Sequence, residues 1–114
     1  MSFEETEIIL DKLLKILNDM ENNPSTDLDL TIAQQGLYDI ADSKYSSFIE
    51  DHIYSPDEEI VEDFRLLGIS EKSLIFKFLE CCVGFMKKCV DEDKPVFYER
   101  FLHFVSLLEI FRID

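Results

Sequence analysis

Residues that interrupt regular structure are scarce in this sequence. Among its 114 residues there are only three glycines and three prolines, and each glycine stands alone. Isolated glycines exclude a glycine-rich phosphate loop, in which several backbone amides must converge on one phosphate. Alternation of apolar and polar residues at the period of two expected for a half-buried strand is also scarce. Both shortages favour helices over a sheet.

Paired cysteines and long hydrophobic runs are missing as well. The three cysteines, Cys81, Cys82 and Cys89, lie in one apolar segment and form no C-x-x-C motif. This arrangement is unlike a disulfide scaffold or a paired zinc site, and it predicts small buried thiols in a reducing compartment. The most apolar stretch, residues 74–86, is too short and too charged to span a membrane. With an acidic start unlike a secretory signal, the sequence predicts a cytoplasmic protein without membrane contact.

Positive charge is nearly absent from the first half of the chain. Residues 1–63 carry 17 Asp and Glu against 3 Lys and Arg, whereas residues 64–114 carry 8 of each kind. The net charge of −14 therefore belongs entirely to the first half. Charge concentrated in this way favours a field presented to a positive partner. It disfavours direct binding of nucleic acid, because the acidic half would repel phosphates.

Apolar residues recur at helical spacing along most of the chain. The hydrophobic fraction of 46%, with ten phenylalanines, is enough to build a core and argues against disorder. Ser2 and Glu5 have the spacing of a capping box, and Asn22-Asn23-Pro24 ends the helix that they begin. From residue 26 onward the pattern predicts two helices or one bent helix, with a break near Asp42-Ser43.

Turn residues predict the ends of the later helices. Ser55 is expected to cap a helix whose first position is Pro56, because acids follow and favour a helix N-terminus. Gly68 is expected to end that helix in a left-handed conformation, and Ser70 to cap the next one. Pro95 is expected to open a last, phenylalanine-rich helix.

The helix expected at about residues 71–90 is apolar almost all round and belongs at the centre of a bundle. Its polar residues collect on one narrow stripe. The predicted fold is an all-α, compact bundle of five to six helices in a single domain, residues 1–114.

No arrangement of residues typical of catalysis is found. The carboxylates come in runs, which are typical of a solvated helix face. His52 has acidic neighbours with which it could bind a metal, but no second histidine lies at ligand spacing, and we expect it on an exposed flank. His103 is expected to be structural or solvent-facing. The sequence therefore predicts a protein that is not an enzyme and that uses no cofactor and no metal.

Tyrosines interleaved with acids are the remaining signal. Tyrosine is favoured at interfaces because it buries a rigid ring while its hydroxyl keeps a partner, and surrounding acids speed the encounter with a basic surface. Equally, such tyrosines can be half-buried helix residues among acids that maintain solubility. The predicted partner-binding residues are Asp42, Tyr45, Glu50, Asp51, Tyr54, Asp57, Glu58, Glu59, Glu62 and Asp63.

A short motif within this segment resembles a known family. Ile53-Tyr54-Ser55-Pro56, followed by three acids, is similar to the Ile-Tyr-Tyr-Pro segment of the colicin DNase immunity proteins, with Ser55 in place of one tyrosine. The resemblance implies a bacterial immunity protein that neutralises a nuclease toxin of a bacteriocin or contact-dependent inhibition system as a monomer in a 1:1 complex. It implies that Tyr54 is the anchor, with Asp51 and the acids after Pro56 facing basic toxin residues.

Two other function classes stay open at this stage. One is a nucleic-acid mimic, whose carboxylates imitate phosphates for a DNA-binding enzyme. The other is a small acidic chaperone or adaptor that shields apolar secreted cargo, which would require an exposed hydrophobic groove.

Overall fold

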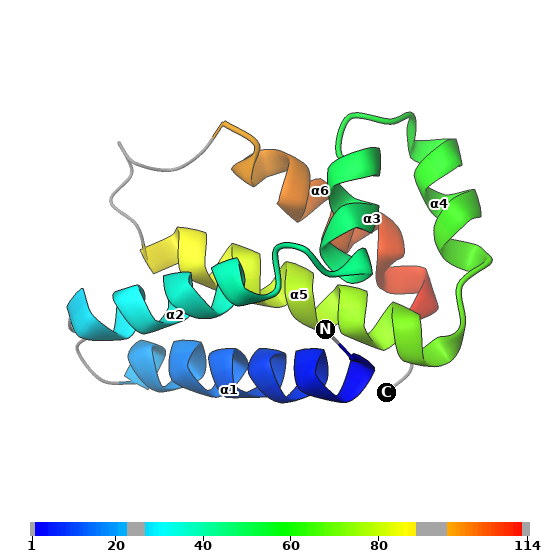
Figure 1. The fold of residues 1–114 in the computed structure, drawn as a ribbon. Coiled ribbons are helices and arrows are strands. Elements are labelled where there is room, and N and C mark those ends of the chain that lie inside the picture. Colours follow the sequence, from blue (N-terminus) through cyan, green and yellow to red (C-terminus); the bar gives the residue numbers. More distant parts are fainter. Residues whose placement is uncertain (1, 23–26, 89–95, 113–114) are drawn as a thin grey trace.

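The computed structural model describes residues 2–22, 27–88 and 96–112 (Figure 1). Within these ranges the chain forms helices and no strand, so the all-α prediction is confirmed. The elements are α1 (Phe3–Asn22), α2 (Asp27–Asp39), α3 (Lys44–His52), α4 (Asp57–Arg65), α5 (Ile69–Lys88), α6 (Tyr98–Leu108) and a short 3₁₀ helix, η2 (Glu109–Phe111).

Helix α5 is the centre of the bundle. Figure 1 shows α1 and α2 running antiparallel to each other along one side of α5, while α3 and α6 lie on another side. Helix α4 packs against α6 at the edge of the molecule. The predicted central helix is thus confirmed, beginning at Ile69. None of the helices in the described ranges combines the length and apolarity needed to cross a membrane.

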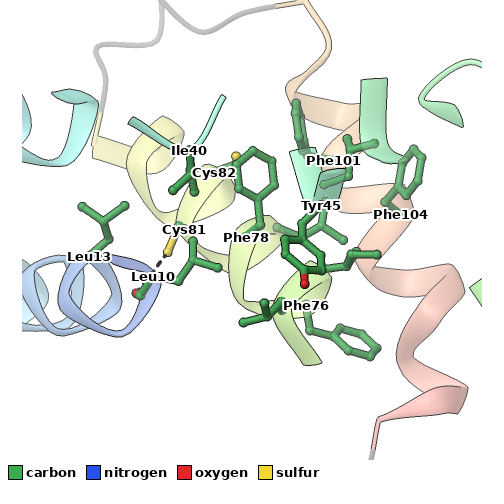
Figure 2. Close-up of a cluster of buried hydrophobic side chains, with 14 of the residues drawn as sticks. Leu10, Leu13, Ile40, Tyr45, Phe76, Phe78, Cys81, Cys82, Phe101 and Phe104 are labelled. Carbon is green, nitrogen blue, oxygen red and sulfur yellow. Dashed lines mark hydrogen bonds between the residues drawn. The ribbon is translucent and has the colours of Figure 1, made fainter. Parts of the chain in front are cut away.

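One cluster of buried apolar side chains draws on all six helices. Figure 2 shows part of it, from Leu10 of α1 to Phe104 of α6. Phe64 of α4 is fully buried, and its ring centroid lies 5.5 Å from that of Phe76 and 5.4 Å from that of Phe111. This single ring connects the peripheral α4 to α5 and to the C-terminal end of the described chain.

Two of the three cysteines behave as the sequence predicts. Cys81 and Cys82 are buried and unpaired, and the Cys81 Sγ donates to the Leu10 carbonyl at 3.7 Å. Burial raises the pKa of the Cys81 thiol to about 12, so it stays protonated at neutral pH and is a poor nucleophile. Cys89 lies outside the described residues.

The predicted start of the first helix and the break before α3 are confirmed, while Asn23 and Pro24, predicted to end the first helix, lie outside the described residues. The Ser2 amide donates to Glu5 Oε2 at 3.3 Å and the Glu5 amide donates to Ser2 Oγ at 3.2 Å, which is the reciprocal capping box. The expected break also occurs, because α2 ends at Asp39 and Ser43 caps α3 by accepting from the Ser46 amide. Residues 27–52 therefore form two separate helices.

Three predicted helix ends are wrong. Ser55 does not cap α4, because Pro56 occupies the cap position, without a side-chain hydrogen bond, and Ser55 belongs to the preceding turn, where its amide donates to the His52 carbonyl. Gly68 has no positive φ, because its carbonyl accepts from Lys72 and so begins α5 rather than ending α4. Ser70 consequently lies inside the first turn of α5. Pro95 lies outside the described residues.

A close approach between α1 and α2 explains the glycine within α2. A Cβ atom at Gly36 would lie 2.5 Å from Leu13 Cδ2, well inside van der Waals contact. A larger residue at position 36 would therefore force the Leu13 side chain, which is buried in the core, to shift. The helix-propensity cost of glycine, about 1 kcal/mol relative to alanine, is therefore tolerated for close packing.

We expect Gly36→Val to lower the free energy of unfolding by about 1–3 kcal/mol through overpacking. Urea denaturation measures this change. Gln34→Val is the matched control, because Gln34 is exposed on the same helix and its replacement tests β-branched propensity alone. Equal destabilisation by both substitutions would show that the α1–α2 contact does not depend on the glycine.

Candidate functional site at the α3–α4 corner

The turn between α3 and α4 presents an exposed tyrosine on a rigid support. Tyr54 is 71% exposed. Arg100 of α6 donates from Nε to the Ile53 carbonyl at 2.7 Å, and its guanidinium carbon lies 6.0 Å from the centre of the Tyr54 ring. One arginine thus fixes the backbone of the turn and supports the ring by a cation–π contact. This contact favours one orientation of the exposed ring.

Carboxylates surround this tyrosine because α3 and α4 fold back on each other across a short turn (Figure 1). All are exposed except Asp63, which is partly exposed. We call this set, together with the tyrosine, the acidic corner. Its members are Glu50, Asp51, Tyr54, Asp57, Glu58, Glu59, Glu62 and Asp63.

The two other predicted partner-binding residues do not belong to the acidic corner. Asp42 is exposed in the turn before α3, so the whole of α3, about 13 Å long, separates it from the turn that carries Tyr54. Tyr45 is only 5% exposed and packs edge-on against Phe3 within the buried cluster (Figure 2). The Tyr45 ring is therefore part of the core, which leaves little of it exposed to a partner.

Some acids of the corner are paired and others are not. Asp57 lies 2.8 Å from His103 Nε2, Asp63 lies 2.7 Å from His52 Nε2, and Glu62 pairs with Arg65 at 2.6 Å. The following acids have no hydrogen-bond or ion-pair partner among the residues that the structure describes: Glu50, Asp51 and Glu58. The outer surface of the corner therefore keeps a negative field that internal pairing does not cancel.

The sequence predicts His52 on an exposed helix flank, but the structure shows its side chain mostly buried. Its side chain is 16% exposed, and its ring stacks on that of Phe48 at a centroid distance of 4.4 Å. Burial by itself lowers the pKa of His52, but hydrogen bonds to Asp63 and the Phe48 carbonyl, with the charges of Asp63 and Glu59, raise it overall. The contact between His52 and Asp63 ties α3 to α4.

An apolar hollow of about 310 Å³ lies beside the corner, between α3, α5 and the start of α6. Glu50 and Ile53 lie at this hollow, which adjoins the Tyr54 turn. Sequence reasoning missed it because its walls come from three helices. The lining residues are Ser46, Ile49, Glu50, Ile53, Phe78, Phe97 and Phe101.

Comparisons with known proteins return no relative. No protein-family model matches the chain, and neither the curated proteins nor the solved structures give a significant match. Function must therefore be inferred from the chemistry of the acidic corner itself.

The His52–Asp63 pair predicts a pH-dependent contribution to stability. Because the pKa of His52 is raised on folding, this contribution is fully present below the unfolded value of about 6.5 and is lost as pH rises through the folded pKa. A double-mutant cycle of His52→Gln and Asp63→Asn, measured by urea denaturation with a chelator present, reports it. We expect a coupling of about 0.5–1 kcal/mol near pH 6 and less near pH 9. A coupling that is constant or grows with pH would contradict the assignment.

Proposed function

We propose that this protein is a non-enzymatic inhibitor that neutralises a basic partner protein through the acidic corner, and that it is an immunity protein against a nuclease toxin. The observation that carries this proposal is Tyr54, exposed and in contact with Arg100, near three carboxylates that have no partner among the residues the structure describes. A nuclease fits as the partner because it must bind polyphosphate and so has a basic groove.

Fast association with a basic partner protein depends on the unpaired acids. Glu50, Asp51 and Glu58 lie around the Tyr54 turn and lack described partners. Opposite charge on two surfaces raises the association rate and rejects acidic competitors. These carboxylates need not break an internal ion pair before they meet a partner lysine or arginine.

Slow dissociation of the partner protein depends on Tyr54 and the apolar hollow. The exposed Tyr54 ring, in contact with Arg100, can be buried by a partner, and buried aromatic contacts slow dissociation. The hollow suits the aliphatic stem of a partner arginine or lysine, because Phe97 and Phe101 supply apolar walls and Glu50 supplies a carboxylate. Inhibition then follows from occlusion, since a bound helical domain covers the groove that nucleic acid must enter.

We expect Tyr54→Ala to raise the dissociation rate of the complex roughly tenfold or more, with little change in stability. The partner is the basic protein captured by the wild-type chain from its native cell, and a nuclease assay with purified components measures inhibition. Tyr38→Ala is the matched control, because Tyr38 is 68% exposed but lies on α2. Loss of binding in the Tyr38 variant alone would place the interface elsewhere.

Charge-reversal variants distinguish effects on the association rate from effects on the dissociation rate. We expect Glu50→Lys or Glu58→Lys to lower the association rate and weaken its salt dependence, because each removes an unpaired charge from the corner. Asp42→Lys makes the same change in net charge at the other end of α3 and should have a smaller effect. Stopped-flow association at two salt concentrations gives both quantities. Equal slowing in all three variants would mean that only net charge matters.

A second candidate, a chaperone or adaptor for apolar cargo, is favoured by an open groove on another face. A hollow of about 630 Å³ runs between α1, α5 and α6, and its apolar lining includes Leu17, Val83 and Leu102. Binding of a cargo helix in that groove would be abolished by Leu102→Glu and unaffected by Tyr54→Ala. The inhibitor proposal predicts the reverse. A nucleic-acid mimic would instead compete with DNA, and its affinity would fall steeply with salt.

A further inference from the structure

We propose that His52, Glu59 and Asp63 form a binding site for a divalent transition metal, with zinc the best fit. Each residue offers one ligand atom, and the three atoms lie within 4.8 Å of one another. They come from two helices, His52 from the end of α3 and both acids from α4. This site goes beyond the proposed function, because it requires no protein partner.

The backbone sets the histidine nitrogen that can act as ligand. His52 Nδ1 lies 2.8 Å from the Phe48 carbonyl oxygen, which can only accept a hydrogen bond. Nδ1 must therefore carry a hydrogen, and in the neutral ring Nε2 holds the free lone pair. Nε2 is the atom that faces Asp63. A ring nitrogen donating to a backbone carbonyl is the usual second contact of a metal-binding histidine, and it fixes both tautomer and orientation.

The two carboxylates are placed to complete the site. Glu59 and Asp63 are four residues apart on α4, so their side chains lie on the same face of the helix. Glu59 is exposed and Asp63 is 43% exposed, which leaves a path for an ion and an open position for water. Stacking on Phe48 holds the imidazole while the acids stay free to adjust.

The distances require only a small rearrangement. His52 Nε2 and Asp63 Oδ2 are 2.7 Å apart, as a hydrogen-bonded pair. Two ligands of a tetrahedral zinc, at bond lengths of roughly 2.0–2.2 Å, lie about 3.3 Å apart. Opening this pair by about 0.6 Å, together with a rotation of the exposed Glu59, brings all three atoms to one ion.

Charge and donor type favour a metal at this place. With His52 protonated, the cluster still holds one uncompensated negative charge, whereas a divalent ion bound to the neutral ring balances both carboxylates. One imidazole and two carboxylates suit zinc, while calcium and magnesium prefer oxygen ligands alone. The bound ion would join α3 to α4 and hold the acidic corner in one arrangement.

The test is zinc titration of the untagged, full-length chain in a Cys89→Ser background, after treatment with a chelator and its removal. Isothermal titration calorimetry should give one zinc per chain, the unfolding temperature should rise with zinc, and cobalt should give the absorption of a four-coordinate site. We expect His52→Gln and Glu59→Gln each to weaken binding roughly tenfold or more. Circular dichroism checks that both variants fold.

His103→Gln is the matched control. It removes the other histidine–carboxylate pair, that of His103 and Asp57, which belongs to no three-ligand group in the described part of the chain. It should bind zinc as the wild type does.

Unchanged affinity in the Glu59 variant, or equal binding of magnesium, would overturn the proposal by showing general screening of an acidic surface. Because these measurements use no partner protein, their failure would leave the inhibitor proposal standing, and failure of Tyr54→Ala would leave the metal site standing.

Discussion

Enclosure of α5 is the constraint on which the rest of the structure depends. Eight of its side chains are buried, and they point in several directions, so no single neighbouring helix can cover them. Because burying apolar surface contributes about 25 cal/mol per Å², leaving any of these side chains exposed to water would be costly. Helices α1 to α3, although acidic outside, must therefore present apolar faces to α5. The charged half and the neutral half of the sequence share one core for this reason.

Helix α4 is the exception to this arrangement, and it carries much of the negative charge. Its anchors in the core are Ile60 and Phe64, both fully buried, and its outer face is charged. Both histidines of the chain contact it, His52 through Asp63 and His103 through Asp57. Protonation of either histidine strengthens a contact that holds α4 to a neighbouring helix. Helix α4 thus joins a buried apolar face, through Ile60 and Phe64, to an exposed acidic face.

The two proposals draw on the same excess of negative charge at different residues. The inhibitor proposal uses Tyr54 with Glu50 and Glu58 on the outer surface, where internal partners are lacking among the described residues. The metal proposal uses the inner contact of α3 with α4. In both, a cation from outside relieves the repulsion that folding creates by bringing seven carboxylates to one corner.

The sequence by itself determined the helices, the central place of α5 and the composition of the corner, because helical periodicity and contiguous acids are local properties. Local signals did not decide which helix a turn residue begins or ends, so the predicted roles of Ser55, Gly68 and Ser70 at helix ends were wrong. Tyr45 shares the apolar stripe of Phe48 and Ile49, and only packing showed that its ring is buried. The meeting of His52 with Asp63, and of Arg100 with Ile53, was decided by the tertiary structure alone. These contacts depend on how α4 and α6 fold back onto α3, and no spacing along the chain encodes the distance between two helices.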